Sequence, residues 1–119
     1  MKMKHFNISE FDSPDLPGSG INMKKKFLEK LIKARRIADI PFIINSGYRT
    51  LSHNSQVRGT LNSAHVKGLA TDIHCVNSNN RFIIISALLI AGFNRIGIYN
   101  TWIHVDCDES KPQNIIYWG

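Results

Sequence analysis

Apolar positions recur along the chain with two different periods, and each period predicts a different kind of element. Over 23–38 the apolar residues fall at helical spacing and most basic residues lie off that stripe, so we expect an amphipathic helix. Pro41 ends this segment. A second, mostly apolar helix is predicted over 81–91, ended by Gly92. Its apolar run is too short to cross a bilayer, and we expect no membrane insertion.

Short apolar segments bounded by turn residues predict the strands. These segments are 42–45, 70–76, 95–99, 102–107 and 115–118. The third and fourth form a hairpin, and the last adds an edge strand. The polar residues 50–68 show no period and are interpreted as a long irregular stretch, which in a small domain is usually functional or mobile. The order of elements predicts an α+β fold, a small antiparallel sheet with helices on one face.

Two of the predicted strands alternate ionisable and apolar residues. Residues two apart on a strand share a face. Asp72 and His74 therefore point one way on their strand, and His104 and Asp106 do so on theirs. Such groups are costly to bury unpaired, whereas in a cleft they suit a metal ion. The alternation predicts a polar site on one face of the sheet.

His65, Asp72 and His104 form a candidate zinc site. Zinc in hydrolytic enzymes takes three ligands from His, Asp or Glu and leaves one position for water. These residues supply two imidazoles and one carboxylate. Gly68 allows a backbone turn between His65 and Asp72 that a side chain would obstruct.

The composition describes one basic domain over residues 1–119. The chain has 15 Lys and Arg against 9 Asp and Glu, a formal charge of +6, and 43% hydrophobic residues. This length excludes a two-domain enzyme. The charge favours an anionic partner, which includes a wall polymer, nucleic acid or an anionic membrane. The sequence contains no nucleic-acid-binding motif, and its aromatic residues are scattered instead of lying along a basic stripe. We therefore expect no nucleic-acid partner.

Cysteine usage and the first residues bear on location. Residues 1–6 turn polar at once and contain no apolar signal segment, so we expect a protein that is cytoplasmic as synthesised. Cys75 and Cys107 are too few for a disulfide scaffold or a Cys-based zinc site. They point away from the candidate site on neighbouring strands and are interpreted as free thiols, and whether they pair stays open.

Three motifs in order resemble a known family. Residues 63–72 match S-x-H-x-x-G-x-A-x-D, residues 46–49 read S-G-Y-R, and residues 103–106 contain H-x-D. Together they resemble the zinc D-alanyl-D-alanine carboxypeptidases and related peptidoglycan peptidases, peptidase family M15. Smaller agreements extend the resemblance over nearly the whole chain. It is most similar to short single-domain members found in phages and prophages.

The resemblance implies a fold and roles for particular residues. It implies the hedgehog and D-Ala-D-Ala-peptidase fold, with Zn²⁺ held by His65, Asp72 and His104. Arg49 falls on a family arginine in the active site, where a guanidinium can stabilise an oxyanion or pair with a substrate carboxylate. Ser63 falls on a serine that hydrogen-bonds the substrate.

The sequence departs from the family at the expected general base. Several members carry a Glu three residues before the last His ligand, and here that position is Thr101. The nearest substitute is Asp106, which either acts as the base or orients the imidazole of His104. Both roles stay open. Asp108 and Glu109 are weaker candidates.

The sequence thus predicts a zinc metallopeptidase acting on peptidoglycan stem peptides, as an endolysin would. Either the D-Ala-D-Ala bond or an L-Ala-D-Glu type of bond is the target. The alternative is a catalytically inactive relative that binds the wall or builds a phage particle. We expect a monomer that is released to the cell wall or carried in a phage particle.

Overall fold

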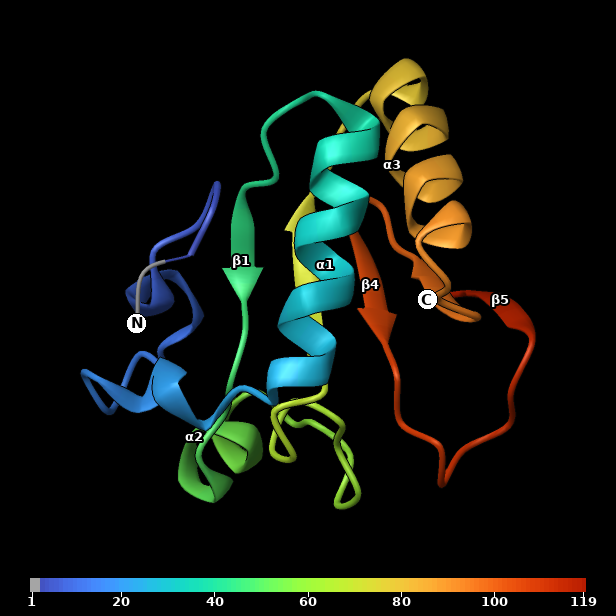
Figure 1. The fold of residues 1–119 in the computed structure, drawn as a ribbon. Coiled ribbons are helices and arrows are strands. Elements are labelled where there is room, and N and C mark those ends of the chain that lie inside the picture. The colour runs from blue at the N-terminus through green and yellow to red at the C-terminus, as the bar shows by residue number, and fades with distance from the viewer. Residues whose placement is uncertain (1–2) are drawn as a thin grey trace.

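A five-stranded sheet with two long helices on one face forms the framework of the protein (Figure 1). The computed structural model describes residues 3–119. The helices are the 3₁₀ segments η1 (Ile8–Phe11) and η2 (Ser19–Asn22) and the α-helices α1 (Lys25–Ala38), α2 (Leu51–Gln56) and α3 (Ser78–Ile90). The strands are β1 (Ile44–Ser46), β2 (Ala70–His74), β3 (Arg95–Ile98), β4 (Trp102–Asp106) and β5 (Ile115–Trp118). The predicted α+β class is confirmed.

The sheet is mixed, and this corrects the expectation of an antiparallel one. Its order is β1-β2-β4-β3-β5, and only β5 pairs in parallel, with β3. The reason is that β2 and β3 occupy both edges of β4, so the chain leaving β4 cannot turn back beside it. Residues 107–114 instead form a long loop from β4 to β5 (Figure 1), and β5 pairs with the free edge of β3 in the direction of β3.

The hydrophobic core lies between the sheet and the helices α1 and α3, which lie side by side over it (Figure 1). The buried residues of α1 are the members of its predicted apolar stripe Phe27, Leu28, Leu31 and Ala34. Helix α3 begins three residues before the predicted start, because the side chain of Asn77 accepts a hydrogen bond from the Asn80 N–H and caps it. One face of the sheet is thus closed, and the other remains for the site.

The long polar stretch contains one helix that the sequence pattern does not reveal. Helix α2 begins after Thr50, whose hydroxyl accepts a hydrogen bond from the His53 N–H at 3.1 Å. It is six residues long and has no apolar stripe, so periodicity cannot detect it. Residues 57–69 are irregular and lead into β2.

The two cysteines lie at opposite ends of the ladder between β2 and β4. The antiparallel register pairs His74 with Trp102 at one end and Ala70 with Asp106 at the other. Cys75 follows β2 at the first end and Cys107 follows β4 at the other end, and both thiols are free.

In the described part of the chain, no helix has the length and apolar character that crossing a bilayer requires.

Candidate metal centre

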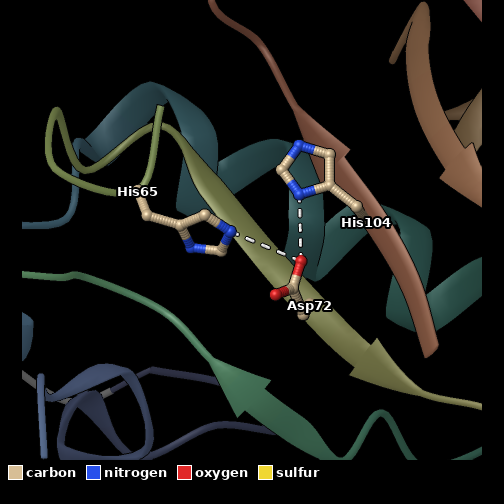
Figure 2. Close-up of side chains that lie close together, drawn as sticks. All are labelled: His65, Asp72 and His104. Atoms are coloured by element: carbon tan, nitrogen blue, oxygen red, sulfur yellow. Dashed lines mark hydrogen bonds and ion pairs between the residues drawn. The ribbon is translucent and has the colours of Figure 1, made fainter. Parts of the chain in front are cut away.

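Asp72 on β2 and His104 on β4 lie directly opposite each other in the antiparallel ladder. Their neighbours Ile73 and Ile103 are fully buried in the core beneath the helices. Because side chains alternate along a strand, Asp72 and His104 project from the other face (Figure 2). The Nδ1 atom of His104 lies 2.9 Å from Oδ1 of Asp72. The predicted polar face of the sheet is present.

His65 reaches the same place from the irregular loop before β2 (Figure 2). Its Nδ1 donates a hydrogen bond to the Gly47 carbonyl at 2.8 Å, and its Nε2 lies 3.4 Å from Oδ1 of Asp72. The loop turns at Gly68, which has φ +71° and whose missing Cβ would lie 2.3 Å from the Asn22 carbonyl oxygen. Only glycine combines this conformation with this close approach.

The three residues offer a donor set that suits zinc. One ligand atom from each of His65, Asp72 and His104 lies within 4.8 Å of the other two. The hydrogen bond to Gly47 places the proton of His65 on Nδ1 and leaves the Nε2 lone pair facing Asp72. The contact of His104 Nε2 with Asp106 likewise turns Nδ1 toward the centre. Two imidazole nitrogens and one carboxylate oxygen with fixed tautomers therefore fit a catalytic zinc site.

Asp106 is a buried carboxylate whose two oxygens are both engaged. It is 1% exposed. Oδ2 accepts from His104 Nε2 at 2.7 Å, and Oδ1 accepts from Arg95 Nε at 2.7 Å and from the Asp108 N–H at 3.0 Å. Arg95 in turn donates to the Pro112 carbonyl. Asp106 is thus held behind His104.

Hydrogen bonding controls the charges of the centre. Burial alone would raise the pKa of Asp72, but hydrogen bonds from His104 and His65 hold it well below its usual range. Burial alone would lower the pKa of His104, and hydrogen bonds to Asp106 and Asp72 outweigh this and raise it. The pKa of Asp106 is lowered, since its hydrogen bonds outweigh its burial. Without a metal ion, the two carboxylates therefore favour the protonated imidazole of His104, whose Nδ1 faces Asp72 and whose Nε2 faces Asp106.

Arg49 lies beside the ligand group. Its guanidinium donates three long hydrogen bonds, to Oδ2 of Asp72 at 3.5 Å, to the Ser46 hydroxyl at 3.3 Å and to Oδ1 of Asn54 at 3.3 Å. Its backbone N–H also donates to the His65 carbonyl at 3.2 Å. Burial lowers the pKa of Arg49, and the charge of Asp72 opposes this. The arginine remains a cation with weakly engaged donors.

The other residues singled out from the sequence lie at different distances from the centre. Ser63 is buried, lines the site cavity and accepts the His65 N–H on its hydroxyl at 3.2 Å. Thr101 is exposed in the turn between β3 and β4 and does not line this cavity. His74 is exposed and also lies outside the cavity lining.

A cavity of about 480 Å³ opens over the ligand group. The lining includes residues that the sequence pattern did not single out for the site, namely Arg58, Arg95, Tyr99, Lys111 and Tyr117. The rings of Tyr99 and Trp102 stack with centroids 4.6 Å apart. The volume is typical of a site for a peptide-sized ligand.

The sequence does indicate the positions of some of these additional lining residues. Gly97 pairs with His104 across the β3–β4 ladder, so the two residues share the site face. The period of two then places Arg95 and Tyr99 on that face as well. Tyr117 pairs with Gly97 in the parallel register and completes the row. Applying the same alternation to the predicted hairpin 95–107 would have found Arg95 and Tyr99, whereas the place of Tyr117 depends on the parallel pairing of β5 with β3.

Comparison with known proteins identifies the family. A sequence model of the family described as Peptidase M15 matches residues 4–106. No curated protein matches the chain. The matched region contains the motifs around Arg49, His65 and His104, and it ends at Asp106. The chain therefore belongs to the peptidase family M15.

Proposed function

We propose that the chain is a zinc-dependent peptidase that hydrolyses peptide bonds in peptidoglycan stem peptides. The proposal depends on one observation, the grouping of His65, Asp72 and His104 on the floor of a cavity in a chain of this family. Zinc bound to this set would supply Lewis acidity toward a carbonyl oxygen and acidify a water molecule. The target is a D-Ala-D-Ala or an L-Ala-D-Glu type of bond. The protein then acts at the cell wall, after release or from a phage particle.

Arg49 stabilises the negative charge that develops on the scissile carbonyl oxygen or pairs with a substrate carboxylate. Its three side-chain hydrogen bonds are between 3.3 and 3.5 Å long, so a substrate oxygen can compete for its donors. The half-buried guanidinium acts in a region from which water is partly excluded, where such a contact is stronger than in open solvent.

Asp106 orients His104 in this proposal. Both of its oxygens already accept hydrogen bonds and its pKa is lowered, so it has little tendency to take up a further proton. A carboxylate behind a ligand imidazole fixes the tautomer and the direction of the lone pair. This assignment favours one of the two roles that the sequence leaves open.

Ser63 binds substrate through its hydroxyl proton. Its oxygen accepts the backbone N–H of His65, and this leaves the O–H to donate into the cavity. A carbonyl of the extended stem peptide is a suitable acceptor.

A binding module without catalysis is the second candidate, and one observation favours it. The carboxylates that line the cavity are Asp72 and Asp106, and both are engaged by neighbouring side chains. Among residues 3–119, the lining therefore holds no unengaged carboxylate that could serve as a general base.

Mass spectrometry of digested muropeptides separates the two candidates. Purified peptidoglycan is incubated with the zinc-loaded wild type, with His65→Ala and with His74→Ala, which removes a histidine that does not line the cavity. The peptidase proposal predicts released alanine or cleaved stem peptides with wild type and His74→Ala and none with His65→Ala. Intact stem peptides with every wall type would favour the binding module.

A further inference from the structure

Three arginines and one lysine line the cavity, and three of these four side chains have acceptors in the protein. The four are Arg49, Arg58, Arg95 and Lys111. Arg49 and Arg95 contact the carboxylates of the centre, and Lys111 contacts Asp108 at 2.7 Å. The side chain of Arg58 makes no ion pair or hydrogen bond within residues 3–119, although it lines the same cavity. Arg58 is exposed, so its five N–H donors are available to a ligand.

The backbone position of Arg58 is nevertheless fixed. Arg58 has φ +56°, a left-handed conformation that is uncommon outside glycine. Its N–H donates to the Ser55 carbonyl at 3.1 Å, and the following Gly59 N–H donates to the Asn54 carbonyl at 2.8 Å. The Asn54 side chain donates to the Thr60 carbonyl at 2.8 Å. The turn that carries Arg58 is therefore hydrogen-bonded on both sides to the end of α2.

Asn54 connects this turn to the metal centre. The residue is 4% exposed, and its Oδ1 accepts from the guanidinium of Arg49 at 3.3 Å. A Cβ on Gly59 would lie 2.0 Å from that same oxygen, so the turn packs directly on the amide. One buried side chain thus contacts both the Arg49 guanidinium and the backbone that follows Arg58.

We propose that Arg58 is a specificity-determining residue that binds a carboxylate of the substrate at a distance from the scissile bond. The inference rests on the proposed function and deepens it. A guanidinium binds a carboxylate through two parallel hydrogen bonds, and Arg58 has no competing acceptor in the protein. A stem peptide offers two such groups, its C-terminal carboxylate and the free carboxylate of its D-Glu residue.

Binding of synthetic stem pentapeptides tests the assignment without depending on turnover. The metal-free full chain is titrated with a peptide that has both carboxylates, with one amidated at the C-terminus, and with one amidated at D-Glu. We expect Arg58→Ala to weaken binding of the first peptide about tenfold, since a charge-assisted hydrogen bond contributes about 1.4 kcal/mol or more. Arg58→Lys retains part of the affinity. The amide that abolishes the effect of Arg58→Ala identifies the recognised group.

Arg36→Ala is the matched control, because it removes an exposed arginine from α1 on the other face of the sheet. It should leave all three affinities unchanged. The inference is overturned if Arg58→Ala behaves like Arg36→Ala, or if the wild type binds the two amidated peptides as tightly as the peptide with both carboxylates. Arg58-dependent binding without cleavage by the zinc-loaded chain would reject the peptidase and keep the carboxylate site. Cleavage whose kcat/KM is unchanged by Arg58→Ala would keep the peptidase and reject the carboxylate site.

Discussion

The Nδ1 atom of His104 and the Oδ1 atom of Asp72 are 2.9 Å apart, across a pair of residues in register on neighbouring strands. In the metal-free protein this contact holds a proton, because the two carboxylates beside His104 raise its pKa above the ordinary value despite its burial. A metal ion that takes both atoms as ligands must displace that proton. Zinc affinity should therefore depend on pH.

Zinc binding is expected to release about half a proton or more per metal at pH 6.5 from His104 alone, because its raised pKa keeps it mostly protonated there. Affinity should fall as the pH drops through this pKa. Calorimetry in two buffers of different ionisation enthalpy measures the released protons. Asp72→Ala should abolish stoichiometric binding, and His74→Ala should leave it unchanged. A binding heat that is the same in both buffers would contradict the proton-displacement argument.

Asp106→Asn separates the two roles considered for this residue. If Asp106 orients His104, the substitution lowers zinc affinity by about 10–100-fold, and turnover recovers substantially at saturating zinc. If Asp106 is the general base, zinc affinity changes little and turnover falls by about 10²–10⁴ even with the site saturated. Competition with a fluorescent chelator gives the affinity, and muropeptide release gives the turnover. We expect the first pattern, and the second would return the base role to Asp106.

The grouping of His65, Asp72 and His104 was predictable because its information is local. Asp72 and His104 sit in strands whose period of two shows which residues share a face, and His65 belongs to the same motif as Asp72. The hairpin of β3 and β4 was predictable for the same reason. This hairpin also places Arg95 opposite Asp106, but alternation alone does not show that β5 pairs with β3, so the position of Tyr117 in the cavity was not predictable.

The remaining features depend on contacts between distant segments. The parallel pairing of β5 follows from the occupation of both edges of β4, which no residue of 115–118 encodes. The position of Arg58 depends on a left-handed turn packed against Asn54, in a stretch without apolar period. The separation of Cys75 from Cys107 likewise follows from the direction of strand pairing.

Gly97→Ala should destabilise the protein by about 1–2 kcal/mol, because a Cβ there would lie 2.6 Å from the ring of Tyr117. The ring would have to move, and it lies with its centroid 6.3 Å from that of His104. In a Tyr117→Ala background the added methyl meets no ring, so Gly97→Ala should become neutral or stabilising there. Urea unfolding of the four proteins measures this coupling. Equal costs in both backgrounds would exclude the steric explanation.

Asp108 connects the loop that carries His65 to the segment after β4. Its buried carboxylate accepts from Lys67 at 2.8 Å and from Lys111 at 2.7 Å, and Lys111 also donates to the Asn62 carbonyl. Burial alone would raise the pKa of Asp108, but the hydrogen bonds from both lysines hold it well below its usual range. A carboxylate with a lowered pKa stabilises the fold above its ordinary pKa of about 4, and this contribution is lost as the pH falls.

Asp108→Asn is therefore expected to lower the free energy of unfolding by about 2 kcal/mol at pH 7, since it leaves two lysines without a charged acceptor. The difference from wild type should shrink below pH 4, as the wild-type carboxylate itself becomes protonated. Urea unfolding at pH 7, 4 and 3 measures the trend, and Glu109→Gln serves as control because its ion pair with Lys26 is exposed at 3.7 Å. A difference that stays constant with pH would show that the amide disturbs packing at Asp108 and not its charge.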